Sequence, residues 1–162
     1  KKYYDAYFQL YQNVWCHGDY ILINNHGGIQ IFGRSDATLN PGGVRIGTSE
    51  IYQVIDNIDG VLDSVIVGHS IGDDEEVILF VKLTHDNQLD ADLIAYIKTK
   101  IRGECSPRHV PAKIMAAPDI PYTLNGKKVE IAIKNLIHGK DVANRDALAN
   151  PESLDYFANL SL

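Results

Sequence analysis

Cysteine is scarce in this sequence of 162 residues, in which only Cys16 and Cys105 occur. The two thiols lie far apart and do not form the CxxC spacing of redox and zinc motifs. The six histidines also lack metal-ligand spacing. Two separated cysteines argue against a disulfide framework and suit a reducing compartment. We therefore predict free thiols, no metal site in this chain and a cytoplasmic protein.

The sequence also lacks a long apolar run. No stretch approaches the roughly 20 apolar residues of a membrane-spanning helix. The opening KKYYDAYFQLY has neither the apolar centre nor the small-residue cleavage site of a signal peptide. We therefore predict a soluble protein with no membrane partner. The opening has no initiator methionine either, so we expect the sequence to start partway along a longer chain.

Concentrated positive charge is absent as well. Lysine and arginine number 15 against 21 acidic residues, for a formal charge of -6, and the only adjacent basic pairs are Lys1-Lys2 and Lys127-Lys128. Binding to a nucleic-acid backbone needs a basic patch or stripe. We therefore predict that nucleic acid is not a partner.

The first third of the sequence predicts a short helix, a hairpin and a hinge. Aromatic and aliphatic residues recur near one helical face as far as Leu10 and Tyr11. Residues 14 to 34 are mostly of β-type and surround the Asn/Gly-rich turn NNHGG, which is typical of a hairpin. SDATLNPGGVRIG then brings small polar residues and a Pro-Gly-Gly turn, as a hinge before a second hairpin would. We place a domain boundary at Ser35 to Ala37.

Helical and β-type patterns alternate in the middle of the chain. We predict a helix capped by Thr48, followed by two antiparallel strands in VLDSVIVGHS and EEVILFVKL around the acidic turn IGDDE. A second helix, capped by Asp90 and ending near Gly103, precedes a third strand in PRHVPAKIMAAP.

The last third adds two predicted helices. VEIAIKNLI alternates like a strand in its first half but suits a helix in its second, and we choose the helix. NPESLDYFANL has Asn150 as a cap and Pro151 at the first helical position. The fold class is therefore α+β, with a small antiparallel or mixed three-stranded sheet, helices packed on it and a preceding β-hairpin.

Four charged residues follow glycine-bearing turns, where a backbone can approach a ligand closely. They are Asp19, Arg34, Arg45 and Lys127. Taken one at a time, each is more simply read as a solvated charge in a turn. Their order along the chain is more informative.

The segments HGDY, GRSDATLNPGGVRIGTSEIY and PYTLNGKK, in this order, resemble the late motifs of the adenylate-forming acyl-CoA synthetase superfamily. The resemblance covers nearly the whole chain. Asn40 stands where members acting on aromatic or long-chain acids usually have lysine, which resembles the short-chain acid branch. TLNPGGVRIGTSEIY, PYTLNGKKVE and NPESLDYF are most similar to the ligases that activate acetoacetate. The rivals are an acetate or propionate ligase, and a stand-alone module that binds nucleotide or protein without catalysis.

The resemblance implies two domains and three substrates. Residues 1 to 35 would end the large N-terminal adenylate-forming domain, and residues 36 to 162 would form the mobile C-terminal domain. The substrates would be acetoacetate, ATP and coenzyme A, with Mg²⁺ bound by ligands outside this chain. The triphosphate loop and the acyl pocket of the family precede these motifs. We therefore expect the 162-residue chain alone to be inactive.

The resemblance also assigns roles to residues that would meet ATP or AMP. Lys127 would be the catalytic cation that bridges the carboxylate and the α-phosphate. Asp19 would accept hydrogen bonds from the ribose hydroxyls, and Arg34 would support the same ribose. Arg45 would meet the phosphates.

Three further residues would serve the hinge and coenzyme A. Asp36 matches the hinge position about which the small domain rotates. Gly43 matches the glycine of the loop that lines the pantetheine tunnel. Arg102 matches an arginine near the nucleotide phosphate of coenzyme A, although Arg108 could substitute for it.

Overall fold

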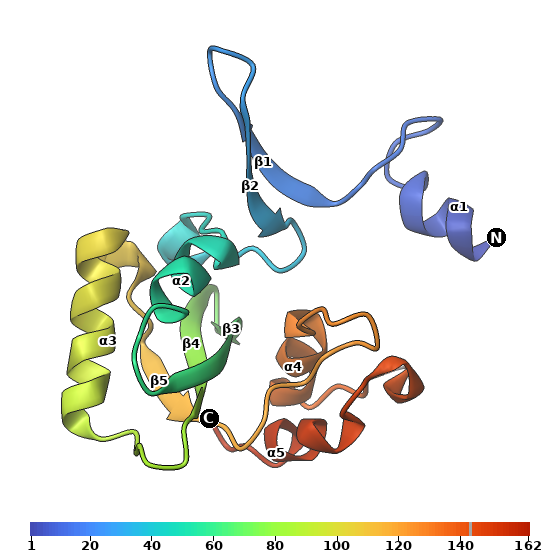
Figure 1. The fold of residues 1–162 in the computed structure, drawn as a ribbon. Coiled ribbons are helices and arrows are strands. Elements are labelled where there is room, and N and C mark those ends of the chain that lie inside the picture. The colour runs from blue at the N-terminus through green and yellow to red at the C-terminus, as the bar shows by residue number, and fades with distance from the viewer. Residues whose placement is uncertain (143) are drawn as a thin grey trace.

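The N-terminal part forms a short helix and a hairpin. A computed structural model describes residues 1–142 and 144–162. Helix α1 (Lys2–Tyr7) precedes strands β1 (Asp19–Ile23) and β2 (Ile29–Arg34), which pair antiparallel and extend away from the rest of the molecule (Figure 1). The predicted hairpin is confirmed, although it is shorter than residues 14 to 34.

The predicted continuation of the first helix to Tyr11 is wrong. Beyond Tyr7 the chain turns back, so that the Trp15 ring lies 4.8 Å from the Tyr7 ring and the Cys16 amide donates to the Tyr7 carbonyl at 2.7 Å. Leu10 lies in the returning loop and is 70% exposed. Packing between aromatic rings has overridden the helical periodicity.

The remainder is a three-stranded mixed sheet covered by helices on both faces, which confirms the predicted α+β class (Figure 1). Strands β3 and β4 are antiparallel, and β5 pairs parallel to β4. The elements are α2 (Thr48–Ile55), β3 (Val61–Ile71), β4 (Asp74–Leu83), α3 (Ala91–Glu104), β5 (Lys113–Ala116), α4 (Glu130–Ile137) and α5 (Leu154–Ala158). Short 3₁₀ turns occur at Pro41–Gly43, Pro107–His109, Arg145–Ala147 and Pro151–Ser153.

Alternation along the central strands builds two hydrophobic cores. Ile66 and Leu79 face the core beneath α2 and α3, whereas Val65 and Phe80 face the core beneath α4 and α5. All four side chains are completely buried, because successive residues of a strand point to opposite faces. Phe80 meets Phe157 of α5 edge to face at 5.1 Å. The sheet is therefore the middle of three layers.

The helix caps follow the sequence in part. The Asp90 side chain accepts a hydrogen bond from the Leu93 amide at 2.8 Å, as predicted. The predicted cap Thr48 is instead the first helical residue, and Glu50 Oε2 accepts from the Gly47 amide at 3.2 Å. Gly103 lies inside α3, which continues to Glu104.

Asn150 occupies a cap position but does not cap. Its amide group donates to Asp119 Oδ2 at 2.6 Å and to the Ile120 carbonyl at 2.9 Å, and its oxygen accepts from the Tyr122 amide at 2.9 Å. The side chain therefore ties the C-terminal segment to the chain leading into the turn before Lys127.

Burial differs sharply between the two ends of the chain. Among residues 1 to 35 whose side chains are described, none is buried, and the first buried residue is Leu39. Leu22, Ile23, Ile29 and Ile31 of the hairpin are 51% exposed or more. Within the described residues, no helix combines the length and apolarity needed to cross a membrane.

Candidate functional site

Arg34 lies where the hairpin joins the helix-covered sheet. Its Nε and Nη2 atoms donate to the two carboxylate oxygens of Asp36, each at 3.1 Å, and Nη1 donates to the His17 carbonyl at 2.9 Å. The hydrogen bond to Asp36 raises the pKa of Arg34, although partial burial opposes the rise. Arg34 therefore remains a cation with its planar fork occupied by the residue at the predicted hinge.

Strand pairing brings Asp19 to the same place. In the β1–β2 register Asp19 stands directly opposite Arg34. His17 Nδ1 lies 2.6 Å from Asp19 Oδ2. Gly18 has φ of 84°, and a Cβ there would come within 3.0 Å of Arg34 Nη2, so glycine leaves room for the guanidinium.

His17 contacts the predicted site residue Asp19, and sequence reasoning missed it. Its side chain is 71% exposed, whereas that of Asp19 is 25% exposed. The signal was available in the segment HGDY, because Gly18 bends the chain and lets residues 17 and 19 face each other. The imidazole can orient the carboxylate through their hydrogen bond.

Arg34 and Asp36 line two clefts. The first has a volume of about 610 Å³ and is bordered by α1, the loop to β1 and residues 34 to 36. The second has a volume of about 350 Å³. It is lined by Arg34, Asp36, Ala37, Thr123 and residues 127 to 132. The fold therefore brings Lys127 to the same cleft as Arg34 and Asp36, although about 90 residues of chain separate them.

Lys127 is presented by a tight turn. The Thr123 carbonyl accepts from the Gly126 amide at 2.8 Å, and the Thr123 amide donates to the Lys127 carbonyl at 2.8 Å. Gly126 has φ of 72°, which suits glycine at this position. The Lys127 side chain is exposed, and within residues 1–142 and 144–162 no carboxylate lies within 4.0 Å of its ammonium.

The neighbouring Lys128 is held by the protein itself. Its Nζ lies 3.0 Å from Asp63 Oδ1 and 4.2 Å from the centre of the Tyr52 ring. The Tyr52 hydroxyl donates to Glu130 Oε1 at 3.1 Å. Burial, assisted by the charge of Glu130, raises the pKa of Tyr52 well above its usual value. Of the two adjacent lysines, Lys127 is available to a ligand and Lys128 anchors the turn.

Three predicted residues lie elsewhere. Gly43 belongs to the turn after Asn40 and has φ of 77°; apart from its chain neighbours, no atom of the described residues lies within 4 Å of the place where a Cβ would stand. Arg45 follows this turn and is exposed. Arg102 is exposed on α3, whereas Arg108 Nη1 would lie 3.7 Å from a Cβ at Gly42. Arg108, rather than Arg102, therefore lies beside the turn at residues 40 to 43.

The charged residues at and beside the Lys127 cleft suit an anionic, hydroxyl-bearing ligand. Arg34 and Lys127 line the cleft and offer cationic donors to phosphate or carboxylate oxygens. Asp19 is not among the lining residues, but it stands opposite Arg34 in the strand pairing and offers carboxylate acceptors to hydroxyl groups. These residues therefore fit a nucleotide such as ATP. Among the described residues, no group of three or more His, Cys, Asp or Glu side chains is arranged to hold a metal ion.

The chain is similar to acetoacetyl-CoA synthetases both in sequence and in structure. No family model matches this chain. It is 54% identical over 159 residues to an acetoacetyl-coenzyme A synthetase of Rhizobium meliloti (strain 1021), covering 98% of this chain and 24% of that protein. The acetoacetyl-CoA synthetase structure from Streptomyces lividans has a TM-score of 0.89 and 36% identity, covering 97% of this chain and 24% of that one. The ATP-bound RpMatB-BxBclM chimera B1 has a TM-score of 0.64 and 25% identity, covering 75% and 25%. The chain spans about a quarter of the length of these relatives.

Proposed function

We infer that this chain, which is homologous to acetoacetyl-CoA synthetases along nearly its whole length, is the C-terminal portion of an AMP-forming acid–CoA ligase. The ligase would convert acetoacetate, ATP and coenzyme A to acetoacetyl-CoA, AMP and pyrophosphate. The observation that carries the proposal is 54% identity along 98% of the chain. It is supported by Lys127, which lines a cleft together with Arg34 and has no carboxylate within 4.0 Å among the described residues.

The chemistry would proceed in two steps at one site. First, a carboxylate oxygen attacks the α-phosphorus, so that an acyl-adenylate forms and pyrophosphate leaves. Then the thiol of coenzyme A attacks the acyl carbon, the thiol proton is lost and AMP leaves. Negative charge grows on the phosphoryl oxygens in the first step, so a positioned ammonium lowers its barrier. We assign that role to Lys127, because its ammonium has no carboxylate partner among the described residues.

The same proposal assigns the nucleotide contacts. Asp19 accepts hydrogen bonds from the ribose hydroxyls, and its contact with His17 orients the carboxylate. Arg34 supports the ribose, and the exposed Arg45 meets the phosphates. Mg²⁺ would be bound by residues outside this chain, and we expect the parent ligase to be cytoplasmic.

We further propose a division at the hinge, with residues 1 to 35 as the end of a large N-terminal domain and residues 36 to 162 as the mobile domain. The absence of any buried side chain among the described residues 1 to 35 supports it, because a domain needs a core of its own. The exposed apolar residues of the hairpin are then expected to pack against the large domain. Asp36 is the hinge, and its exposed ion pair with Arg34, worth about 0.2–1 kcal/mol, is weak enough to break on rotation.

Acid-dependent exchange of pyrophosphate into ATP by the full-length ligase tests the proposal. We expect exchange with acetoacetate to exceed that with acetate or propionate. A preference for acetate or propionate would change the acid assigned, and absence of exchange with all three would refute the proposed reaction. The 162-residue chain alone should give no exchange, because the triphosphate and acyl sites are expected outside it.

A further inference from the structure

Two carboxylates hold the turn formed by residues 40 to 43, which we call the glycine turn. Asp74 Oδ1 accepts a hydrogen bond from the Gly42 amide at 2.8 Å, and Glu75 Oε1 accepts one from the Asn40 amide at 2.7 Å. Both carboxylates stand at the start of β4, more than 30 residues further along the chain. Two side chains of the β3–β4 hairpin therefore hydrogen-bond to backbone amides of the glycine turn.

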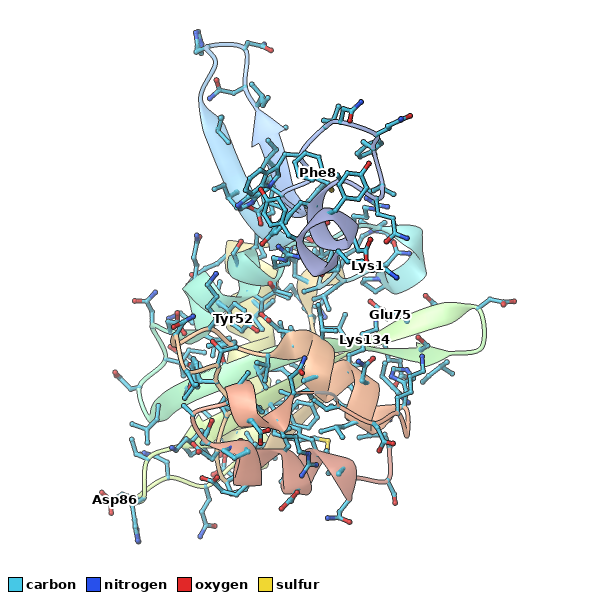
Figure 2. All side chains as sticks on the ribbon, turned by 90° about the vertical axis from the view of Figure 1, so that its right-hand side faces the viewer. Lys1, Phe8, Tyr52, Glu75, Asp86 and Lys134 are labelled. Atoms are coloured by element: carbon cyan, nitrogen blue, oxygen red, sulfur yellow. The ribbon has the colours of Figure 1, made fainter. Side chains whose placement is uncertain are left out.

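The Glu75 side chain is fixed by a further ion pair. Its second carboxylate oxygen accepts from Lys134 Nζ of α4 at 2.7 Å, and Figure 2 shows the two side chains close together. The Glu75 side chain is only 12% exposed. Its carboxylate lies over Gly68 of β3, and a Cβ at Gly68 would overlap it. Room for the carboxylate therefore depends on a glycine in the middle of a strand.

The glycine turn needs such support. Gly42 and Gly43 have φ of 57° and 77°, and both residues are exposed. Successive glycines lose more conformational freedom on ordering than other residues do, so hydrogen bonds must hold this conformation. Hydrogen bonds from the amides of Glu75 and Gly42 also lower the pKa of Asp74, so its carboxylate is charged at neutral pH.

We propose that Asp74 and Glu75 are positioning residues for thioester formation, because they set the glycine turn that carries Gly43 beside the thiol arm of coenzyme A. This inference rests on the proposed function. All residues that form these hydrogen bonds lie after residue 36. The hydrogen bonds would therefore be kept when the mobile domain rotates about the hinge. Lys127 lies on a separate turn that neither carboxylate contacts among the described residues. We therefore expect the two carboxylates to serve the second step, with Asp74 as the sharper probe, because Glu75 also pairs with Lys134 of α4, a helix whose first residues line the Lys127 cleft.

The experiment compares single variants of the full-length ligase in both half-reactions. Asp74→Ala removes the hydrogen bond to the Gly42 amide, and Glu75→Ala removes the one to the Asn40 amide. Asp73→Ala and Glu76→Ala are matched controls, because Asp73 makes no side-chain hydrogen bond or ion pair among the described residues and Glu76 pairs with Lys113 at 3.4 Å instead of with the glycine turn. Asp74→Asn keeps an acceptor oxygen for the Gly42 amide and should restore activity.

We expect kcat/KM for coenzyme A to fall about tenfold in both alanine variants, since small misplacements of a binding element are costly. Acid-dependent pyrophosphate exchange should stay at the level of the unmodified ligase, as should both activities of the two controls. Equal losses in the two half-reactions would indicate a purely structural role and overturn the inference. An unchanged kcat/KM for coenzyme A in both alanine variants would overturn it as well. Absence of exchange in the unmodified ligase would instead refute the proposed function itself.

Discussion

The adjacent lysines of the PYTLNGKK segment should respond in opposite ways to the same substitution. Lys127 is exposed and has no carboxylate within 4.0 Å among the described residues, whereas Lys128 contacts Asp63 and the Tyr52 ring. Replacing each lysine singly by methionine keeps the length of the side chain and removes its charge. We expect Lys127→Met to stop chemistry without loss of stability, and Lys128→Met to lower stability.

The magnitudes follow from these contacts. Lys128 and Asp63 side chains are 20% and 22% exposed, so their ion pair is only partly screened, and the ammonium also lies 4.2 Å from an aromatic ring. Loss of both contacts should cost about 2 kcal/mol. In a chain of this size that loss corresponds to a fall in Tm of roughly 4–8 °C. Removing a cation that stabilises developing charge should slow adenylation by about 10²–10³-fold.

Two assays separate the effects. Thermal unfolding of the 162-residue chain, followed by circular dichroism, should give an unchanged Tm for Lys127→Met and a lowered Tm for Lys128→Met. Pyrophosphate exchange by the full-length ligase should collapse in Lys127→Met and be largely retained in Lys128→Met below its Tm. Surviving exchange in Lys127→Met would refute the assignment of the catalytic cation. An unchanged Tm in Lys128→Met would refute the anchoring role.

Three further outcomes are expected. Arg108→Ala should raise KM for coenzyme A several-fold more than Arg102→Ala, because Arg108 lies beside the glycine turn. The reverse order in steady-state kinetics would assign the contact with coenzyme A to Arg102. Burial and the nearby His138 lower the pKa of His69, so the unfolded chain binds the proton more readily, and stability should decline as pH falls below about 6.5. This decline in Tm should be smaller in His69→Gln. An equal decline in the variant would show that His69 is not its cause. Asn150→Ala removes three part-buried hydrogen bonds and should cost about 2–3 kcal/mol in denaturant unfolding. A loss below experimental error would show that Asn150 does not tie the C-terminal segment to the chain before Lys127.

Local patterns predicted most of the fold. Continuous apolar runs in VLDSVIVGHS and EEVILFVKL specify strands buried on both faces, and the two-residue turn after Ile71 makes them antiparallel. Asp90 specified a helix start because its cap bond closes within one turn. The helix near the N-terminus was overestimated, because contact between Tyr7 and Trp15 depends on how the following loop returns.

The sequence alone determined the order of elements, the α+β class and which charged residues follow glycine turns, since each depends on residues close together in the chain. Tertiary structure alone decided which charges meet. Strand register set Asp19 opposite Arg34, and chain folding brought Lys127 to the cleft lined by Arg34 and Asp36. It also decided that Lys128 is anchored while Lys127 has no carboxylate partner in the part of the chain that the structure describes, because Asp63 and Tyr52 contact Lys128 from distant elements. Contacts of this kind depend on packing in three dimensions, which no local spacing records.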